Sequence, residues 1–349
     1  MKMEEKVVGR GRGLEGLRIG LAYNARQPDD PPHGERLEEE YVARVEGAIG
    51  DLGHRVVRLE MTRPADRIVD LLLDRAPDLV FNLAEGTEPT RREAFYPAIY
   101  EVLRIPYTGG GPALLRTGLN KRLTKKILSV EGVQVPRGFI LTGDSPELPE
   151  ELEFPLFFKP NEEGSSIGIT RKSVARNREE AEELAAEMVR DFPLGVDVEE
   201  FIEGKELTVP MLEEWPDNVL EIVEYNVKDD EGNIMGQEIK GAGDASEVLD
   251  TYCPARLTPV QRDRVLKTAE TVYRVFRTDD FGRVDLRLDQ VGQPYFIEIN
   301  PLPGLREKSP LVTAAAAVGF RYEEVIERII TSAARRYGLI GSGLDHDGR

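Results

Sequence analysis

The chain is poor in cysteine, in long apolar runs and in positive charge. Its single cysteine, Cys253, excludes an internal disulfide and a cysteine-ligated metal cluster. No apolar run is long enough to cross a bilayer, and the basic residues among the first 15 are not followed by the apolar core of a secretory signal. We therefore expect a cytoplasmic protein without a membrane partner.

Negative charge is in clear excess, with 64 Asp and Glu against 46 Lys and Arg and a net charge of −18. Such a field opposes a nucleic-acid partner. It also repels a nucleotide at long range, so any nucleotide site must bring its own local cations and a metal.

The order of apolar segments predicts a mixed α/β and α+β protein of 349 residues in several domains. Strands at 17–23, 56–59, 79–82 and 105–107 alternate with helices at 36–52, 66–74 and 94–103, which is typical of a doubly wound α/β domain. A helix at 121–129, strands at 138–141 and 156–159 and a helix at 178–190 form a second unit. A third unit is expected from Val196, with strands at 206–211, 220–227 and 284–288 and helices at 259–276 and 322–336. The expected divisions are a flexible leader at 1–15, domains at 16–115, 116–198 and 199–340, and a tail at 341–349.

Two short strands near the C-terminus place oxygen ligands side by side. Asp285 is expected to begin a strand that ends near 288, and the turn at 289–293 would bring the next strand back antiparallel. Alternate side chains of a strand share a face, so Glu298 and Asn300 would project together toward Asp285. Two carboxylates and an amide oxygen suit Mg²⁺ or Mn²⁺ bound between the protein and nucleotide phosphates. The alternative is a surface hairpin with incidental acids.

A glycine- and serine-rich loop follows the strand that ends at Lys159. Residues 160–168 bring backbone N–H groups and serine hydroxyls close to an anion, and Lys159 adds a positive charge. A flexible hairpin loop is the alternative. Lys121, at the start of a helix, is a candidate for a second phosphate contact, although an isolated lysine is by default solvated.

The acidic stretch 199–206 links the second and third units. Extended backbone there offers hydrogen bonds to an adenine edge, and Glu206 is placed to accept hydrogen bonds from ribose hydroxyls. Taken alone, the stretch is equally an acidic linker.

Together these segments, over about residues 81–319, resemble the ATP-grasp enzymes and most closely the D-alanine–D-alanine ligase family. The resemblance implies ATP bound between two lobes, 116–198 and 199–340, behind an N-terminal substrate domain at 16–115. It implies two Mg²⁺ or Mn²⁺ ions on Asp285, Glu298 and Asn300. The implied nucleotide contacts are Lys121, Lys159, Glu163, Ser166, Glu199, Glu200, Ile202, Glu206 and Lys240.

The resemblance also implies the chemistry. A carboxylate is a poor electrophile, so the γ-phosphoryl group is transferred to it and an amine attacks the acylphosphate. Lys240 would reach the terminal phosphate, Arg283 the oxyanion of the tetrahedral intermediate, and the Ser165 loop would exclude water. A salt bridge to Asp285 is the alternative role of Arg283. Gly304 and Ser309 match the family's site for the carboxylate of the second amino acid. The alternative is a Pro/Gly turn that leads into a helix, and both can be true.

The chain departs from the family in the pocket of the first amino acid. The family's glutamate after the first strand is missing from residues 22–28, and Gly241 stands where the family has a tyrosine linked to that glutamate through the serine equivalent to Ser165. Glu85 instead lies at the carboxyl end of a parallel strand, where ligands of open α/β sheets bind. We expect Glu85 to receive the substrate amino group and Arg92 or Glu93 to contact a further polar group. The alternative is a scaffolding pair between Glu85 and Arg92.

The first functional expectation is therefore a D-alanine–D-alanine ligase of peptidoglycan synthesis that acts on small amino acids. Family resemblance also suggests a homodimer formed through the N-terminal lobe. Two alternatives stay open: a ligase for another amino acid or dipeptide outside cell-wall synthesis, and a non-catalytic ATP-binding sensor or scaffold.

Overall fold

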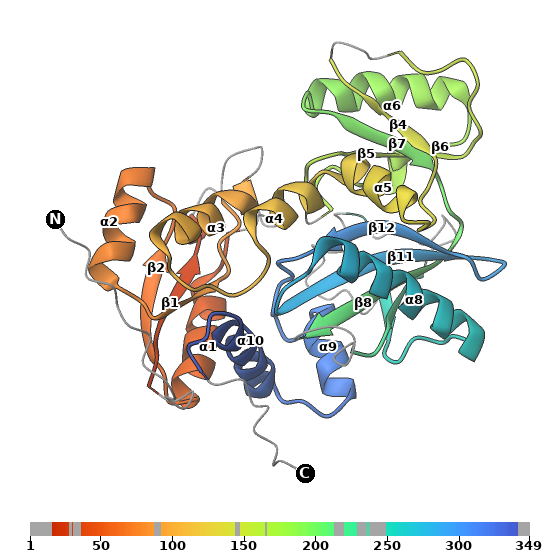
Figure 1. The fold of residues 1–349 in the computed structure, drawn as a ribbon. Coiled ribbons are helices and arrows are strands. Elements are labelled where there is room, and N and C mark those ends of the chain that lie inside the picture. The colour runs from red at the N-terminus through yellow and green to blue at the C-terminus, as the bar shows by residue number, and fades with distance from the viewer. Residues whose placement is uncertain are drawn as a thin grey trace.

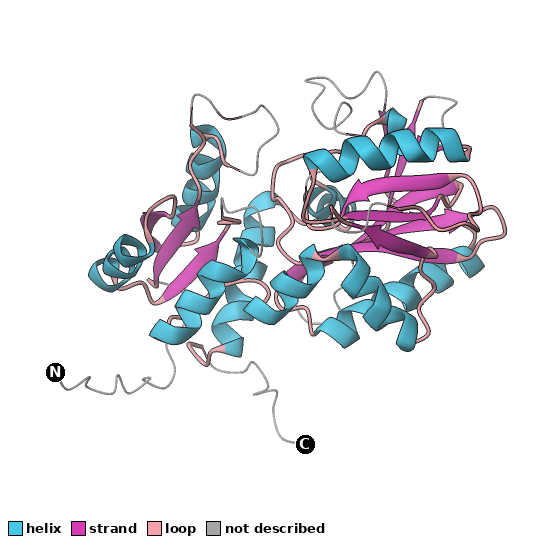
Figure 2. Ribbon diagram, turned by 90° about the horizontal axis from the view of Figure 1, so that it is seen from above, coloured by secondary structure: helices cyan, strands magenta, loops and turns pink. Residues whose placement is uncertain are grey.

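The computed structural model describes residues 16–27, 30, 36–86, 92–143, 147–164, 166–212, 220–228, 236 and 249–340. Within these residues the chain forms three sheets, each covered by helices (Figure 1). Viewed from above, the central and C-terminal sheets overlie one another and the N-terminal sheet stands to one side (Figure 2). This arrangement confirms the expected combination of α/β and α+β units. Among the described helices, none is both long and apolar enough to span a bilayer.

The N-terminal domain is built on a parallel sheet in the order β2-β1-β3. Its elements are β1 (Arg18–Tyr23), α1 (Glu39–Asp51), β2 (Arg55–Glu60), α2 (Ala65–Arg75), β3 (Leu79–Asn82) and α3 (Arg92–Leu103). The prediction of a strand at 105–107 is wrong. Only one bridge forms there, between Val80 and Tyr107, because Pro106 has no N–H to donate to a ladder and glycines follow from Gly109.

The central lobe carries an antiparallel sheet in the order β4-β7-β5-β6, with α6 packed against β5. Its elements are α4 (Pro112–Leu119), α5 (Lys121–Val130), β4 (Gly138–Leu141), β5 (Leu156–Pro160), β6 (Val174–Ala175), α6 (Arg178–Asp191) and β7 (Val196–Glu200). The third unit does not begin at Val196, because β7 pairs with both β4 and β5 and so completes the central sheet. The chain therefore passes to the third sheet only between Glu200 and Gly204.

The C-terminal lobe has an antiparallel sheet in the order β10-β9-β8-β11-β12, with α8 packed on β11 and β12. Its elements are β8 (Gly204–Leu212), β9 (Val223–Val227), β10 (Leu249–Tyr252), α8 (Pro259–Phe276), β11 (Phe281–Asp289), β12 (Pro294–Asn300), α9 (Pro310–Ala317) and α10 (Tyr322–Arg336). Strand β12 lies directly below α5 of the central lobe (Figure 1). The two lobes therefore face each other across α5 and β12.

Helix α10 leaves the C-terminal lobe and packs beside α1 of the N-terminal domain (Figure 1). Residues from both, including Ile49 and Ile329, belong to one apolar core. Arg336 on α10 donates to buried Asp280 at 2.6 Å and to the Tyr107 carbonyl at 2.9 Å. The last helix therefore fixes the N-terminal domain against the C-terminal lobe.

Candidate active site

The hairpin of β11 and β12 aligns the three expected metal ligands. Its register pairs Asp285 with Glu298 and Arg283 with Asn300, so all four side chains lie on one face of the sheet. Strand β11 begins at Phe281 rather than at Asp285, and a register shift follows Asp285. The predicted antiparallel pairing is confirmed, and the register puts the three expected ligands on one face; their role as a ligand set stays a prediction.

Each carboxylate of the hairpin has a polar neighbour. The Thr208 hydroxyl and Arg283 Nε donate to Asp285, the latter at 3.2 Å, and Lys121 Nζ lies 3.3 Å from Glu298 Oε2. Burial by itself would lower the pKa of Arg283, but the nearby carboxylates of Asp285 and Glu298 outweigh it and raise that pKa above its ordinary value. The salt bridge considered for Arg283 therefore exists, and it keeps the guanidinium charged beside the two acids.

The donor set fits a hard divalent cation. Asp285, Glu298 and Asn300 offer carboxylate and amide oxygens, which Mg²⁺ and Mn²⁺ prefer. Across the described ranges, no group of three or more His, Cys, Asp or Glu side chains is placed to hold an ion. Two carboxylates and one amide cannot fill an octahedral shell, so the remaining positions suit phosphate and water oxygens. These residues would therefore hold a metal best when it arrives with a nucleotide.

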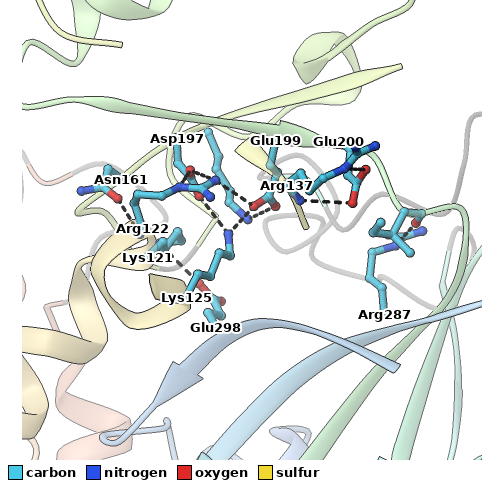
Figure 3. Close-up of polar contacts among 12 residues, drawn as sticks. Lys121, Arg122, Lys125, Arg137, Asn161, Asp197, Glu199, Glu200, Arg287 and Glu298 are labelled. Carbon is cyan, nitrogen blue, oxygen red and sulfur yellow. Dashed lines mark hydrogen bonds and ion pairs between the residues drawn. The ribbon is translucent and has the colours of Figure 1, made fainter. Parts of the chain in front are cut away.

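Lys121 connects the hairpin to the Gly/Ser loop. Its Nζ pairs with Glu298 (Figure 3) and donates to the Glu163 carbonyl at 2.5 Å. The residue is only 5% exposed. It lies at the first position of α5, which is capped by the Asn120 side chain accepting from the Leu123 N–H. The alternative that Lys121 is exposed to solvent is thus wrong. Lys121 lies between the Gly/Ser loop and the β11–β12 hairpin.

Lys159 is fully buried and pairs with Glu199 Oε1 at 2.5 Å. Burial lowers the pKa of Lys159 to about 8, although the Glu199 carboxylate favours the charged form. Lys125 on α5 contacts the other oxygen of Glu199 (Figure 3). Lys159, which is expected to contact phosphate, and Glu199, which is expected to contact adenine, are therefore paired with each other in this structure.

The base of the Gly/Ser loop is anchored by three side chains. Arg92, at the start of α3, lies 3.4 Å from Glu163 Oε2, and Arg116 and Asn120 donate to Glu162 at 3.2 and 2.7 Å. Arg92 is 3% exposed, so this is a buried link from the N-terminal domain to the loop. The sequence assigned Arg92 to a substrate and Glu163 to the nucleotide, and did not predict their ion pair.

Two residues of the loop have left-handed backbone. Ser166 has φ 60° and Gly168 has φ 73°, and a Cβ at Gly168 would lie within 2.6 Å of the Phe192 ring. Glycine is therefore required at 168. Ser165, Lys240 and Gly241 lie outside the described residues, so their expected roles stay predictions.

The segment 201–204 between the lobes is held by Arg287 of β11. Its Nε donates to the Ile202 carbonyl at 2.6 Å and its Nη2 to the Gly204 carbonyl at 3.2 Å, while Nη1 lies 3.5 Å from Glu206 Oε2. Among the described residues, the Ile202 N–H donates to no group, which leaves it available to an adenine nitrogen. The Glu200 carboxylate pairs with exposed Arg137, and the Glu200 N–H donates to the Arg137 carbonyl at 2.8 Å, so both groups are engaged in this structure.

The end of β1, where the family's glutamate is missing, carries a buried asparagine. Asn24 Oδ1 accepts from the Gly86 N–H at 2.9 Å, and its amide donates to Tyr96 at 2.9 Å. Asn24 thus fixes the backbone immediately after Glu85. Glu93 lies half-buried in the first turn of α3. Sequence reasoning assigned no role to Asn24, and the only signal for one was a polar residue directly after a buried strand.

The expected second-substrate loop reaches the N-terminal domain. The Leu305 N–H donates to Tyr41 Oη of α1 at 2.9 Å. Burial raises the pKa of Tyr41, and the charge of Glu85 acts in the same direction. Ser309 is the N-cap of α9, and within the described ranges its buried Oγ has no hydrogen-bond partner. A helix N-terminus with an unpaired hydroxyl suits a carboxylate.

Comparison with known proteins identifies relatives of this chain. A family model described as the D-ala D-ala ligase C-terminus matches residues 143–331. A D-alanine–D-alanine ligase from Nitrosospira multiformis is 34% identical over 232 residues, covering 66% of this chain and 72% of that protein. The uncharacterized protein y4sG of Sinorhizobium fredii is 31% identical over 340 residues, covering 93% of this chain and 95% of that protein.

Solved structures show the same fold at lower identity. The ATP complex of the Bacillus anthracis D-alanine–D-alanine ligase matches with a TM-score of 0.73 and 20% identity, over 93% of this chain and 99% of that chain. The VanG D-Ala:D-Ser ligase of Enterococcus faecalis matches with a TM-score of 0.70 and 19% identity, over 91% and 100%.

Proposed function

The chain belongs to the D-alanine–D-alanine ligase family of ATP-dependent ligases, and from that premise we propose that it forms a dipeptide from D-alanine through an acylphosphate. One observation carries the proposal most strongly. Lys121 of the central lobe pairs with Glu298 of the C-terminal lobe, so a lysine expected on phosphate lies beside a carboxylate expected on metal. A triphosphate bound there would lie between cationic side chains and the metal hairpin.

The proposed reaction needs positioning and charge neutralisation. A carboxylate oxygen of the first amino acid attacks the γ-phosphorus, and the bond to the β,γ-bridging oxygen of ATP breaks to leave ADP. The amine of the second amino acid then attacks the acyl carbon, loses a proton, and displaces phosphate. Divalent ions on Asp285, Glu298 and Asn300 would neutralise charge on the phosphates. Arg283 lies beside these ligands and would stabilise the oxyanion.

The substrate pocket is proposed to lie between the N-terminal domain and the 303–309 loop. Glu85 would receive the ammonium group of the first amino acid, on a backbone fixed by Asn24. Ser309 Oγ and the Gly304 N–H would receive the carboxylate of the second. The Arg92–Glu163 pair would connect this pocket to the Gly/Ser loop that covers the reaction. Glu93 would contact a further polar group.

A second candidate is a ligase for another amino acid or dipeptide. The family model begins only at residue 143, so the N-terminal domain that carries Glu85 lies outside it. The family's glutamate is missing after β1, and Gly241 replaces its tyrosine. These departures affect the amino-acid pocket, while the expected metal and phosphate residues are retained.

A panel of amino acids tests the substrate. The protein is incubated with ATP and Mg²⁺ and with single D- and L-amino acids, and phosphate release and product mass are measured. We expect phosphate release and a dipeptide with D-alanine. Phosphate release only with another amino acid would identify that amino acid, and not D-alanine, as the substrate. ATP binding without phosphate release under any condition would contradict the ligase function.

The same assay tests the pocket through Glu85→Gln. Because this change removes a charged partner of the substrate ammonium, we expect the Michaelis constant of the first amino acid to rise about tenfold or more while that of ATP stays the same. Glu60→Gln is the matched control, since Glu60 lies at the carboxyl end of the neighbouring β2. An unchanged amino-acid Michaelis constant in Glu85→Gln would remove Glu85 from the site.

A further inference from the structure

A cluster of five charged side chains lies buried beside the expected nucleotide site, between α5, β5 and β7 (Figure 3). Three are cations and two are anions, and all are less than a tenth exposed. Lys125 and Asp197 are 0% exposed. The members are Arg122, Lys125, Lys159, Asp197 and Glu199.

The contacts divide the cluster into two parts. Arg122 Nε donates to Asp197 Oδ1 at 2.7 Å and Lys125 Nζ to Asp197 Oδ2 at 2.8 Å, so Asp197 keeps two cationic partners on α5. Glu199 accepts from Lys159 through Oε1 and from Lys125 through Oε2. Lys125 and Arg122 both lie near the two carboxylates, but Arg122 is 3.7 Å from Glu199, whereas Lys125 Nζ donates to it.

Nucleotide binding is expected to remove one ion pair from this cluster, the pair of Lys159 with Glu199. If Lys159 turns to a phosphate, Glu199 loses the partner of Oε1. Burying an ionised carboxylate without a partner is unfavourable, so Glu199 would then depend on Lys125, which contacts its Oε2. Lys125 cannot follow Lys159 to the phosphates without leaving Asp197 and Glu199 behind. Lys125 is thus placed to hold the Glu199 carboxylate in position when Lys159 leaves.

We propose that Lys125 is a positioning residue that holds Glu199 toward the adenine 6-amino group while Lys159 binds phosphate, and that it thereby sets the preference for adenine nucleotides. The inference rests on the proposed contact between Glu199 and adenine. It gives Lys125 no direct contact with the nucleotide. Its effect is on which base is accepted and on how freely Lys159 leaves Glu199.

The test compares ATP with ITP, whose base carries an oxygen in place of the 6-amino group. Dissociation constants are measured by calorimetry with Mg²⁺ present and without amino acid, so the result does not depend on the peptide-forming substrate. In Lys125→Met we expect weaker ATP binding and a loss of about tenfold in the preference for ATP over ITP, the size of one charge-assisted hydrogen bond. Glu199→Gln should lose the same preference.

Two further variants separate positioning from charge and stability. Lys125→Met with Asp197→Asn restores the net charge of the cluster but not the partner of Glu199, and it should still lose the preference. Arg336→Met removes a cation from buried Asp280, which is not a member of the cluster, and should leave the preference unchanged. An unchanged ATP-to-ITP ratio in folded Lys125→Met, or in the double variant if the single one does not fold, would overturn the inference. An unchanged ratio in Glu199→Gln would overturn the adenine contact itself and the inference with it.

Discussion

Replacing Glu298 by glutamine is expected to lower kcat by about a thousandfold, because an expected metal ligand loses its charge where charge develops on the phosphates. The effect should be large because the described residues offer only Asp285 as a second carboxylate at this site. Lys121 would also lose its ion-pair partner. The measurement is single-turnover phosphate release at saturating ATP and amino acid, together with a Mn²⁺ titration followed by magnetic resonance.

The matched control for Glu298→Gln lies on the same hairpin. Asp289 closes the turn between β11 and β12, where its Oδ1 accepts from the Val291 and Gln293 N–H groups, and asparagine can accept the same bonds. Asp289→Asn should therefore retain nearly full activity. If Glu298→Gln kept the turnover and the Mn²⁺ affinity of the wild type, the proposal that this hairpin binds the metal would be contradicted.

Affinity for ATP is expected to fall by about tenfold per pH unit above about pH 8, because Lys159 must be charged to bind phosphate. Burial lowers the pKa of Lys159 to about 8 in the nucleotide-free protein. Below that pH the ammonium is already present. Above it the free protein has lost the proton, whereas the bound phosphates favour the charged form, so binding must take up a proton and weakens.

Proton uptake above pH 8 can be measured directly by calorimetry in buffers of different ionisation enthalpy. Lys125, in the same cluster, should not add to it, because burial is outweighed by Asp197 and Glu199 and the pKa of Lys125 lies above its ordinary value. Lys159→Arg is the control, since arginine stays charged throughout this range. Equal pH dependence in the wild type and in Lys159→Arg would contradict a direct role for Lys159.

Local patterns predicted the metal hairpin well. Alternation along residues 294–300 and a turn closed by Gly292 determine which side chains share a face, so the pairing of Asp285 with Glu298 followed from the sequence. The long helices α8 and α10 were also predicted from local pattern, with the bounds that the structure has. Helix α4 was missed because it is short, contains Gly118 and follows three glycines.

Contacts between distant segments could not be predicted from the sequence. The third unit was expected from Val196 and an acidic linker at 199–206, yet Asp197 and Glu199 are buried in the central sheet because Lys125 and Lys159 neutralise them. More than 70 residues separate Lys125 from either carboxylate. The ion pair of Arg92 with Glu163 depends on the same kind of long-range approach.

The N-terminal pocket shows a different limit. The sequence revealed that a glutamate was missing after β1, but not that Asn24 fixes Gly86 from that position. A hydrogen bond from a side chain to a distant backbone leaves no periodic signal. The specificity of the enzyme is therefore expected to depend on residues that the family motifs do not include.

Oxygen transfer tests the central claim most directly. The protein is incubated with ATP, Mg²⁺ and D-alanine labelled with ¹⁸O in its carboxylate, or with the amino acid that the panel identifies, and the released phosphate is analysed by mass. An acylphosphate places one carboxylate oxygen between carbon and phosphorus, and that oxygen leaves with the phosphate when the amine attacks. We predict that each phosphate released with a peptide carries one ¹⁸O atom. Peptide formed with unlabelled phosphate, or with AMP and pyrophosphate, would contradict the account.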